Sequence, residues 1–264
     1  MTVKLKGIIL PSTLVYPKFD DFKLFDVMKE VPYKTGLLGS YFLGGKNVDP
    51  TYNFANPALP LLAVGNPDTT DARFAKLSRL TGYFNTQLPS TTSLTIVTLC
   101  RQQPTTQQTP SALISNYLKV DASNVSGDSL MKRWRTDGTS EATFYAQTTE
   151  TAVTSVSRND QVAGDEFSVV GGLITSSGST IGVWTMNETT NPGFGAVNIP
   201  SRSTTSRPFL IGCTYSDTEF TSYASVSAML IYQGDIGSTP MANVMNWLRN
   251  VVGVKAGIWP APKP

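Results

Sequence analysis

Two adjoining stretches, YASVSAMLIY at residues 223–232 and STPMANVMNWLRNVVG at residues 238–253, decide the fold of this chain. The first is almost continuously apolar and rich in strand formers, which is typical of a strand buried on both faces. In the second, apolar residues recur every three or four positions from Met241 to Val251, so one face of a helix is apolar. A single amphipathic helix beside many strands must lie on a sheet or close the end of a sandwich. The two stretches therefore predict a β-sandwich with one C-terminal helix as its lid.

Both ends of that helix carry recognisable signals. Ser238 or Thr239 can accept a hydrogen bond from the first N–H groups, and Pro240 suits the first helical position. Gly253 can adopt the left-handed conformation that ends many helices. These signals predict a helix over residues 241–252 that stops at Gly253.

Upstream, short strand patterns alternate with turn residues at intervals of about ten residues, as in antiparallel sandwiches. Residues 36–66 start the sandwich, and residues 187–207 are predicted to be an irregular, glycine- and proline-containing binding loop. The remaining strands are expected at residues 72–78, 94–99, 112–120, 129–135, 142–147, 152–158, 167–175, 180–186 and 209–214. The predicted fold class is all-β.

Residues 1–35 do not follow this pattern. A strand is predicted over residues 3–10 and a short helix over residues 22–31, with Phe22, Phe25 and Met28 on one side. So short a segment cannot form its own core, so it packs on the main domain or on another subunit, and both alternatives stay open. The predicted organisation is an N-terminal docking arm over residues 1–35 and a sandwich over residues 36–264.

The C-terminal stretch also carries a family resemblance. The strand ending in Ile231-Tyr232, followed by a helix with Asn246-Trp247-Leu248 and a Val252-Gly253-Val254 ending, resembles the end of concanavalin A-like (laminin-G-like) jelly rolls of bacteriophage and prophage proteins. Residues 52–66 and 72–99 resemble the opening and the first core strands of such domains, so the resemblance covers roughly residues 36–258.

The resemblance implies a non-enzymatic virion structural protein of a tail, baseplate or fibre that recognises a cell-surface glycan or protein. Its implied partners are other virion proteins and further copies of itself, with a trimer by analogy. The expected location is the virion, after synthesis in the host cytoplasm without a signal peptide. A decoration or cement protein without a ligand, and a polysaccharide-degrading enzyme, are the alternatives.

Composition excludes several function classes. The chain has 264 residues, no histidine, 15% charged residues and a net charge of +2. Without histidine there is no histidine-based triad or general acid–base pair, and most zinc sites are excluded. The weak positive charge argues against nucleic acid as the main partner. No apolar run is long enough to predict membrane insertion.

Carboxylates do not show the spacing of a glycan hydrolase, which needs two of them facing each other across the bond. Asp217-Thr218-Glu219 falls in a predicted turn, and Asp165-Glu166 faces two ways. Asp121, Asn124 and Asp128 are interpreted as turn residues rather than calcium ligands. No catalytic residue, metal or cofactor is therefore predicted.

Ligand-binding residues are sought among aromatic platforms beside polar side chains. Trp134 lies between Arg133 and Arg135, and its alternative role is that of a packed strand residue. Asn187 and Phe194 lie in the predicted binding loop. These five residues are the predicted ligand-binding set, whereas Trp184 is assigned to the core.

Assembly residues are sought among apolar side chains outside the sandwich. Trp259 lies in the proline-rich tail IWPAPKP and is expected to insert into a neighbouring surface, within or between subunits. Together with Phe22, Phe25 and Met28 it forms the predicted assembly interface.

The two cysteines, Cys100 and Cys213, each end an apolar run. They are predicted to be buried free thiols, although a disulfide between them stays open.

Overall fold

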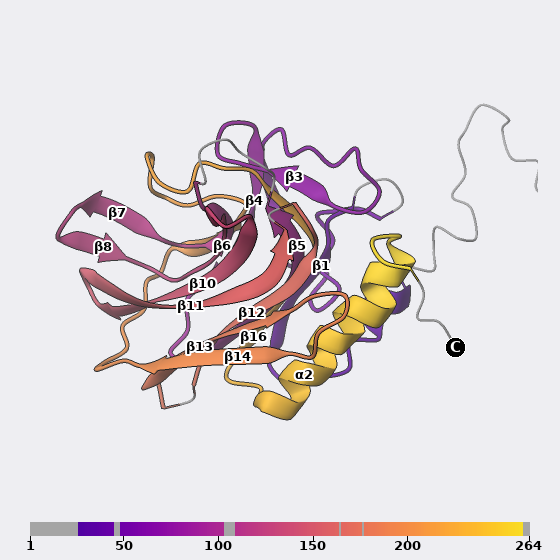
Figure 1. Ribbon diagram of the computed structural model, residues 1–264. Coiled ribbons are helices and arrows are strands. Elements are labelled where there is room, and N and C mark those ends of the chain that lie inside the picture. Colours follow the sequence, from indigo (N-terminus) through magenta and orange to yellow (C-terminus); the bar gives the residue numbers. More distant parts are fainter. Residues whose placement is uncertain (1–25, 45–47, 103–108, 164, 176, 261–264) are drawn as a thin grey trace, which may run out of the picture.

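The computed structural model describes residues 26–44, 48–102, 109–163, 165–175 and 177–260. Within these ranges the strands form two seven-stranded sheets and one small hairpin, and every pairing of strands is antiparallel (Figure 1). The predicted antiparallel sandwich of jelly-roll type, with one C-terminal helix, is confirmed.

Sheet A has the order β1-β16-β5-β12-β13-β14, with β3 beside β16. Its strands are β1 (Leu37–Phe42), β3 (Ala75–Leu77), β5 (Leu94–Gln102), β12 (Ser168–Ile174), β13 (Thr180–Met186), β14 (Gly193–Asn198) and β16 (Ala224–Gln233). Sheet B has the order β11-β10-β9-β6-β15-β4-β2. Its strands are β2 (Leu62–Gly65), β4 (Gly82–Pro89), β6 (Ser111–Ser115), β9 (Ser129–Trp134), β10 (Thr139–Thr149), β11 (Ala152–Ala163) and β15 (Pro208–Ile211). The separate hairpin consists of β7 (Leu118–Asp121) and β8 (Asn124–Ser126).

Strand β16 has a core on each side. Met229 and Ile231 face the interior between the two sheets, whereas Leu230 and Tyr232 face a second apolar cluster on the outer side of sheet A. Alternate residues of a strand point to opposite faces, so a strand buried on both faces must be apolar throughout. This explains the unbroken apolar run that the sequence shows at residues 223–232.

The C-terminal helix α2 (Ser238–Trp247) covers the second cluster and lies along sheet A (Figure 1). Its N-cap is Gly237 without a side-chain hydrogen bond, so the predicted cap by Ser238 or Thr239 is wrong. The helix also does not stop at Gly253. Residues 248–253 form a π-helical continuation, and residues 254–255 are still helical. The backbone reaches the left-handed region at Gly257, where φ is 73°.

The described part of the N-terminal arm packs on this chain. Met28 is 1% exposed and belongs to the same cluster as α2, and the hydroxyl of Tyr232 donates to the carbonyl of Tyr33 at 3.1 Å. Residue 28 is therefore part of the domain's own core, which corrects its assignment to an assembly interface. Phe22 and Phe25 lie outside the described residues, and the boundary at residue 35 stays a prediction.

The predicted loop at residues 187–207 is in part a strand. Residues 193–198 form β14, which pairs with β13 at the edge of sheet A. The ring of Phe194 covers Gly182, where a Cβ would lie 2.3 Å from the ring, and it packs on Trp184 with the centroids 4.7 Å apart. Gly182 on β13 thus leaves space for the ring of Phe194 on the edge strand β14. The prediction of a loop did not include this contact.

Cys100 and Cys213 are both buried free thiols, as predicted. Burial raises the pKa of the Cys100 thiol to about 12, because an apolar surrounding disfavours the thiolate. Among the helices in the described ranges, none is long and apolar enough to cross a membrane.

Candidate functional site

The positive charges around Trp134, on β9 and directly after it, are paired with carboxylates in the structure. Lys132 and Asp160 are fully buried and form an ion pair at 3.0 Å. Arg133 and Arg135 both point to the other side of the strand and bind Glu141, at 2.7 and 2.9 Å. The three cations of residues 132–135 are therefore all paired with carboxylates, although Arg133 and Arg135 remain partly exposed.

Trp134 lies on the opposite side of β9 from the two arginines, because neighbouring strand residues point to opposite faces. Its indole N–H is buried and has no hydrogen-bond partner among the described residues. The structure thus separates Trp134 from Arg133 and Arg135, and the alternative of a packed strand residue fits its position. Phe194 lies apart from them on β14 and is 44% exposed.

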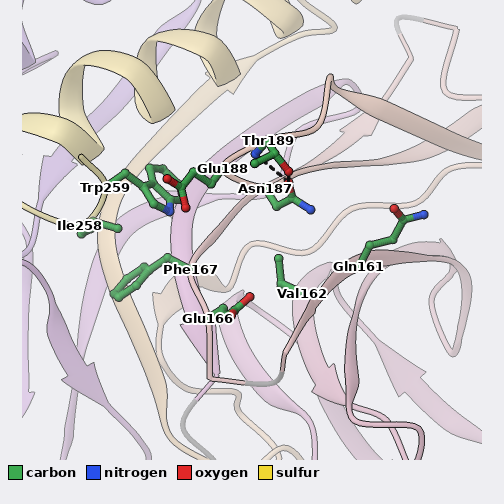
Figure 2. A pocket seen from close by; sticks show the side chains of 9 residues that line it. All are labelled: Gln161, Val162, Glu166, Phe167, Asn187, Glu188, Thr189, Ile258 and Trp259. Carbon is green, nitrogen blue, oxygen red and sulfur yellow. Dashed lines mark hydrogen bonds between the residues drawn. The ribbon is translucent and has the colours of Figure 1, made fainter. Parts of the chain in front are cut away.

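Two of the predicted residues, Asn187 and Trp259, do meet, at a cavity of about 430 Å³ near one end of sheet A (Figure 2). The segment after the helix, the β11–β12 connection and the turn after β13 supply its walls. The lining residues are Gln161, Val162, Glu166, Phe167, Asn187, Glu188, Thr189, Ile258 and Trp259. Trp259 thus packs within its own chain.

Asn187 builds the turn that carries Glu188 and Thr189. Its side-chain oxygen accepts from the backbone N–H groups of Thr189 and Thr190, both at 2.9 Å, and its amide donates to the carbonyl of Asp160 at 3.3 Å. An Asx turn of this kind fixes the backbone at the end of a strand. Asn187, which is 7% exposed, therefore positions its neighbours at the cavity.

Arg249 holds the same turn from the helix side. Its guanidinium donates to the carbonyls of Thr190 at 2.7 Å and Asn187 at 3.3 Å. Together with Asn187 this contact fixes the turn to the C-terminal helix, so the exposed side chains of Glu188 and Thr189 project from a rigid support.

Trp259 owes its position to the missing side chain of Gly253. A Cβ at residue 253 would lie 2.5 Å from the indole, and the carbonyl of Gly253 accepts hydrogen bonds from the N–H groups of Ile258 at 2.8 Å and Trp259 at 3.4 Å. The turn closed at Gly257 folds the tail back onto the helix. The indole is thereby placed in the cavity wall (Figure 2).

The β11–β12 connection forms the third wall. Gln161 has a φ of 59°, a left-handed conformation unusual for a residue with a side chain, and its N–H donates to Asn159 at 2.7 Å. Left-handed non-glycine residues cost energy and are held by their surroundings. Here the conformation lies near the end of β11, at a register shift in its pairing with β10, and the Gln161 side chain is exposed beside the cavity. On the other wall, the ring of Phe167 has the guanidinium of Arg101 over it at 5.0 Å.

The cavity combines groups that suit a polar ring-shaped ligand. Trp259 and Phe167 provide aromatic surface, Gln161 an amide, and Glu166 and Glu188 carboxylates. Among the described residues, neither Glu166 nor Glu188 forms a salt bridge, since the pairs found there involve other acids. These polar groups are open to water and to a ligand.

The other acids that the sequence singled out are engaged elsewhere. Asp217 pairs with Arg79, and Glu219 pairs with Lys119 and accepts from the Tyr117 hydroxyl at 2.9 Å. Across the described ranges no group of three or more acidic or cysteine side chains could hold a metal ion.

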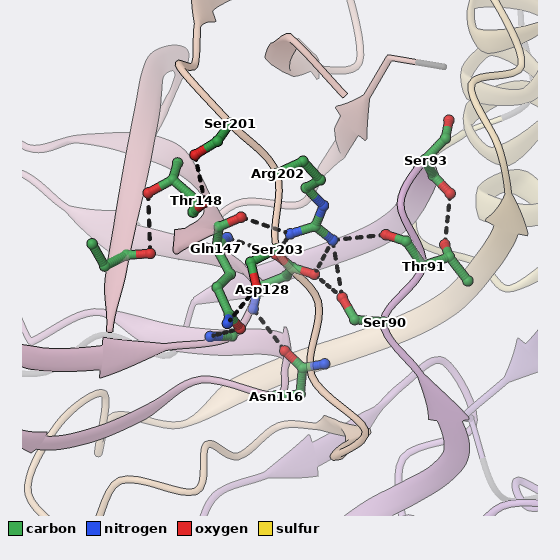
Figure 3. Close-up of polar contacts among 12 residues, drawn as sticks. Ser90, Thr91, Ser93, Asn116, Asp128, Gln147, Thr148, Ser201, Arg202 and Ser203 are labelled. Carbon is green, nitrogen blue, oxygen red and sulfur yellow. Dashed lines mark hydrogen bonds and ion pairs between the residues drawn. The ribbon is translucent and has the colours of Figure 1, made fainter. Parts of the chain in front are cut away.

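Asp128 was interpreted as a turn residue, but it is fully buried (Figure 3). Its two carboxylate oxygens accept from the guanidinium of Arg202 at 2.7 and 2.8 Å, and one also accepts from the N–H of Gln147 at 2.9 Å. Ser90 donates to the same carboxylate and Arg202 to the carbonyl of Thr91 at 2.7 Å. This network fastens the segment around residue 202 to sheet B.

Sequence reasoning missed most of the cavity wall. Glu188 directly follows the predicted Asn187, but nothing in the pattern indicates that the β11–β12 connection lies beside it. The pairing of β12 with β13 provides that proximity. A glycine six residues before Trp259 was the available signal for the folded-back tail, and it was interpreted as a helix end.

Comparisons with known proteins give the fold. No family model and no curated protein matches the chain. The receptor binding domain of botulinum neurotoxin D matches 81% of this chain with a TM-score of 0.53 and 10% identity. Botulinum neurotoxin type C, which depends on interaction with two ganglioside molecules to enter cells, matches 85% with a TM-score of 0.51 and 11% identity. The sialidase CBM40 of Ruminococcus gnavus with bound α2,3-sialyllactose matches 69%, with a TM-score of 0.46 and 11% identity.

The chain spans about half the length of the two neurotoxin chains, 53% of each. At such low identity these likenesses concern architecture. The chain therefore has a jelly-roll sandwich fold like the part of the two neurotoxin chains that it matches.

Proposed function

We propose that this chain is a non-catalytic glycan-recognition domain whose binding site is the cavity beside Trp259. The observation that carries the proposal is the meeting of an indole, an amide and two exposed carboxylates at a cavity of about 430 Å³. Sugars place their C–H faces on aromatic rings and their hydroxyls on amides and carboxylates. The cavity volume also lies within the roughly 300–1,000 Å³ that small-molecule sites occupy. The ganglioside dependence of the type C neurotoxin adds support by analogy of fold.

A glycan array tests this proposal, with the wild-type chain and two variants, Trp259→Ala and Phe194→Ala. Trp259→Ala is expected to lower binding about tenfold, taking as a guide the roughly 1–3 kcal/mol that an aromatic side chain contributes when a nucleic-acid base stacks on it. Phe194→Ala removes a more exposed aromatic ring outside the cavity and should keep binding. Loss with Phe194→Ala alone would move the site to β14, and absence of glycan binding would favour a decoration or cement role.

The wider setting we propose is the tail, baseplate or fibre of a tailed bacteriophage or prophage. The chain would be displayed there with other virion proteins and as a homo-oligomer, a trimer by analogy. The support is the resemblance of the strand–helix segment at residues 223–254 to phage jelly rolls. Mass spectrometry of purified particles, followed by immunogold labelling, tests the location. A chain found only in the soluble lysate would contradict it.

A polysaccharide-degrading enzyme is the second candidate, because Glu166 and Glu188 line one cavity. Glycoside hydrolysis needs one carboxylic acid that keeps its proton, which proteins arrange by burial. Both glutamates are exposed residues, which favours binding over hydrolysis. Incubation of a bound glycan with the chain and assay of new reducing ends separates the two functions. Release that disappears with either Glu→Gln variant would establish the enzyme.

A further inference from the structure

The proposed function uses the carboxylates of the cavity as hydrogen-bond acceptors for sugar hydroxyls. Their negative charge is a further feature that can select among glycans. Glu166 and Glu188 place two carboxylates at its wall, and no lysine or arginine is among its lining residues. One Glu166 oxygen accepts from the N–H of Ala163 at 3.3 Å, so this carboxylate is held at the rim by its own connection. The wall therefore presents negative charge on a fixed frame.

The cations that lie near the cavity already have partners. Lys132 binds Asp160 at 3.0 Å and also donates to the Glu166 carbonyl and to Ser168. Its side chain is fully buried, so it cannot extend into the cavity. Arg249 donates to two carbonyls beneath the Asn187 turn, and it lies on the helix side of that turn.

Arg101 is the third cation; it does not line the cavity and lies over two aromatic rings, Phe167 and Phe74. Its guanidinium lies 5.0 Å from the centroid of Phe167 and 4.7 Å from that of Phe74. The guanidinium of Arg101 therefore covers one face of the Phe167 ring. Trp259 is left as the aromatic ring with π surface available to a ligand.

On these grounds we propose that the cavity selects glycans that carry a protonated amine, such as amino sugars without N-acetyl groups, and rejects acidic sugars. This inference rests on the proposed glycan-binding function and names its ligand class. An ammonium group is attracted by the face of an indole and by carboxylates at the same wall. A sugar carboxylate would meet two like charges with no cation in the wall to offset them.

The test compares glucosamine oligomers, the N-acetylglucosamine oligomers of the same linkage and length, and galacturonate oligomers, by calorimetric titration at low and high salt. The glucosamine oligomer is expected to bind most tightly, and raised salt should weaken it more than its acetylated counterpart. Galacturonate should not bind. Glu166→Gln and Glu188→Gln should each lower glucosamine affinity about three- to fivefold, as for a partly exposed ion pair. They should lower N-acetylglucosamine affinity less than glucosamine affinity, because the glutamine amide can still accept from sugar hydroxyls but has lost the charge.

Glu150→Gln is the matched control, since Glu150 is an exposed carboxylate at the β10–β11 turn, at the other end of β11. Equal losses with Glu150→Gln would show nonspecific attraction of a polycation and overturn the inference. Trp259-dependent binding of the acetylated or acidic oligomer at equal strength would also overturn it while leaving the proposed function intact. If no oligomer binds and array binding is also absent, the proposed function itself fails.

Discussion

Arg202 and Asp128 show how much can depend on a single pair of residues. Arg202 is 5% exposed and Asp128 fully buried, and two charge-assisted hydrogen bonds join them (Figure 3). Replacing Arg202 by methionine leaves a buried carboxylate without its countercharge. We expect Arg202→Met to lower the free energy of unfolding by roughly 3–5 kcal/mol, measured by urea denaturation.

The control for this variant is Arg73→Met. Arg73 binds Asp71 at 2.8 Å, but its side chain is 43% exposed. An exposed pair contributes at most about 1 kcal/mol, so this loss should be small. Similar losses for both variants would mean that burial does not control the strength of these pairs.

Asp160 gives the chain an acid-sensitive interior. Burial acts to raise the pKa of Asp160, but the charge of Lys132 and hydrogen bonds from Ser140, Ser168 and Lys132 outweigh it, so the pKa lies below its usual value. A depressed folded-state pKa contributes stability above the unfolded-state value, about 3.9, and that stability is lost as the pH falls toward the folded-state pKa.

The free energy of unfolding is therefore expected to fall below about pH 4, and Asp160→Asn should flatten this decrease while lowering stability at neutral pH. Urea titrations from neutral to acid pH measure both effects. Asp68→Asn is the matched control. The pKa of Asp68 is also lowered, by hydrogen bonds from Thr70, but this carboxyl is exposed whereas that of Asp160 is buried. If the free energy of unfolding of Asp160→Asn falls with decreasing pH as steeply as that of the wild type, other groups cause the decrease.

At this scale the sequence predicted some residues and missed others for physical reasons. The burial of the two thiols and of Trp184 follows from the apolar runs around them. The buried ion pair of Lys132 could not be predicted, because its countercharge, Asp160, lies 28 positions along the chain and on a different strand. A single sequence shows which residues alternate along one strand, but it does not show which strand lies opposite.

Among the elements, the C-terminal helix connects the fold to the site. Gly253→Ala places a Cβ 2.5 Å from the Trp259 indole, and the tail must move away from it. Alanine is also a better helix former than glycine by about 1 kcal/mol, so helix stability should be kept. We expect at least a fivefold loss of glycan binding with little change in melting temperature, measured by calorimetric titration and thermal denaturation.

Lys255→Ala serves as the matched change, because Lys255 is exposed on the last turn of the same helix. Its glycan affinity should equal that of the wild type. A Gly253→Ala variant with full affinity would show that the position of Trp259 does not depend on this contact.

The sequence predicted the helix and most strands, but not where the helix ends or that β14 exists. Glycine at position 253 serves close packing instead of a left-handed cap. Residues 193–198 carry two glycines and only exposed or half-exposed positions, so they lack the apolar pattern of a strand. Pairing with β13 alone makes this segment a strand.

For the whole molecule, sheet A is stabilised from both sides. The interior between the sheets covers one face, and helix α2 with residues 27–31 covers the other. Deleting residues 238–264 would expose the outer apolar cluster around Leu230 and Tyr232. We expect the truncated chain to bind the dye ANS strongly and to aggregate, and a soluble, monomeric product would contradict this role of the helix.

The order of strands in sheet A has a consequence for synthesis on the ribosome. β1 pairs with β16, so a strand made near the start must wait for residues 224–233 before its neighbour exists. Until those residues leave the exit tunnel, the nascent chain presents an unpaired apolar strand to its surroundings. Closure of the sheet thus has to wait for residue 233, and chaperones that protect unfinished chains are expected to raise the yield of folded protein.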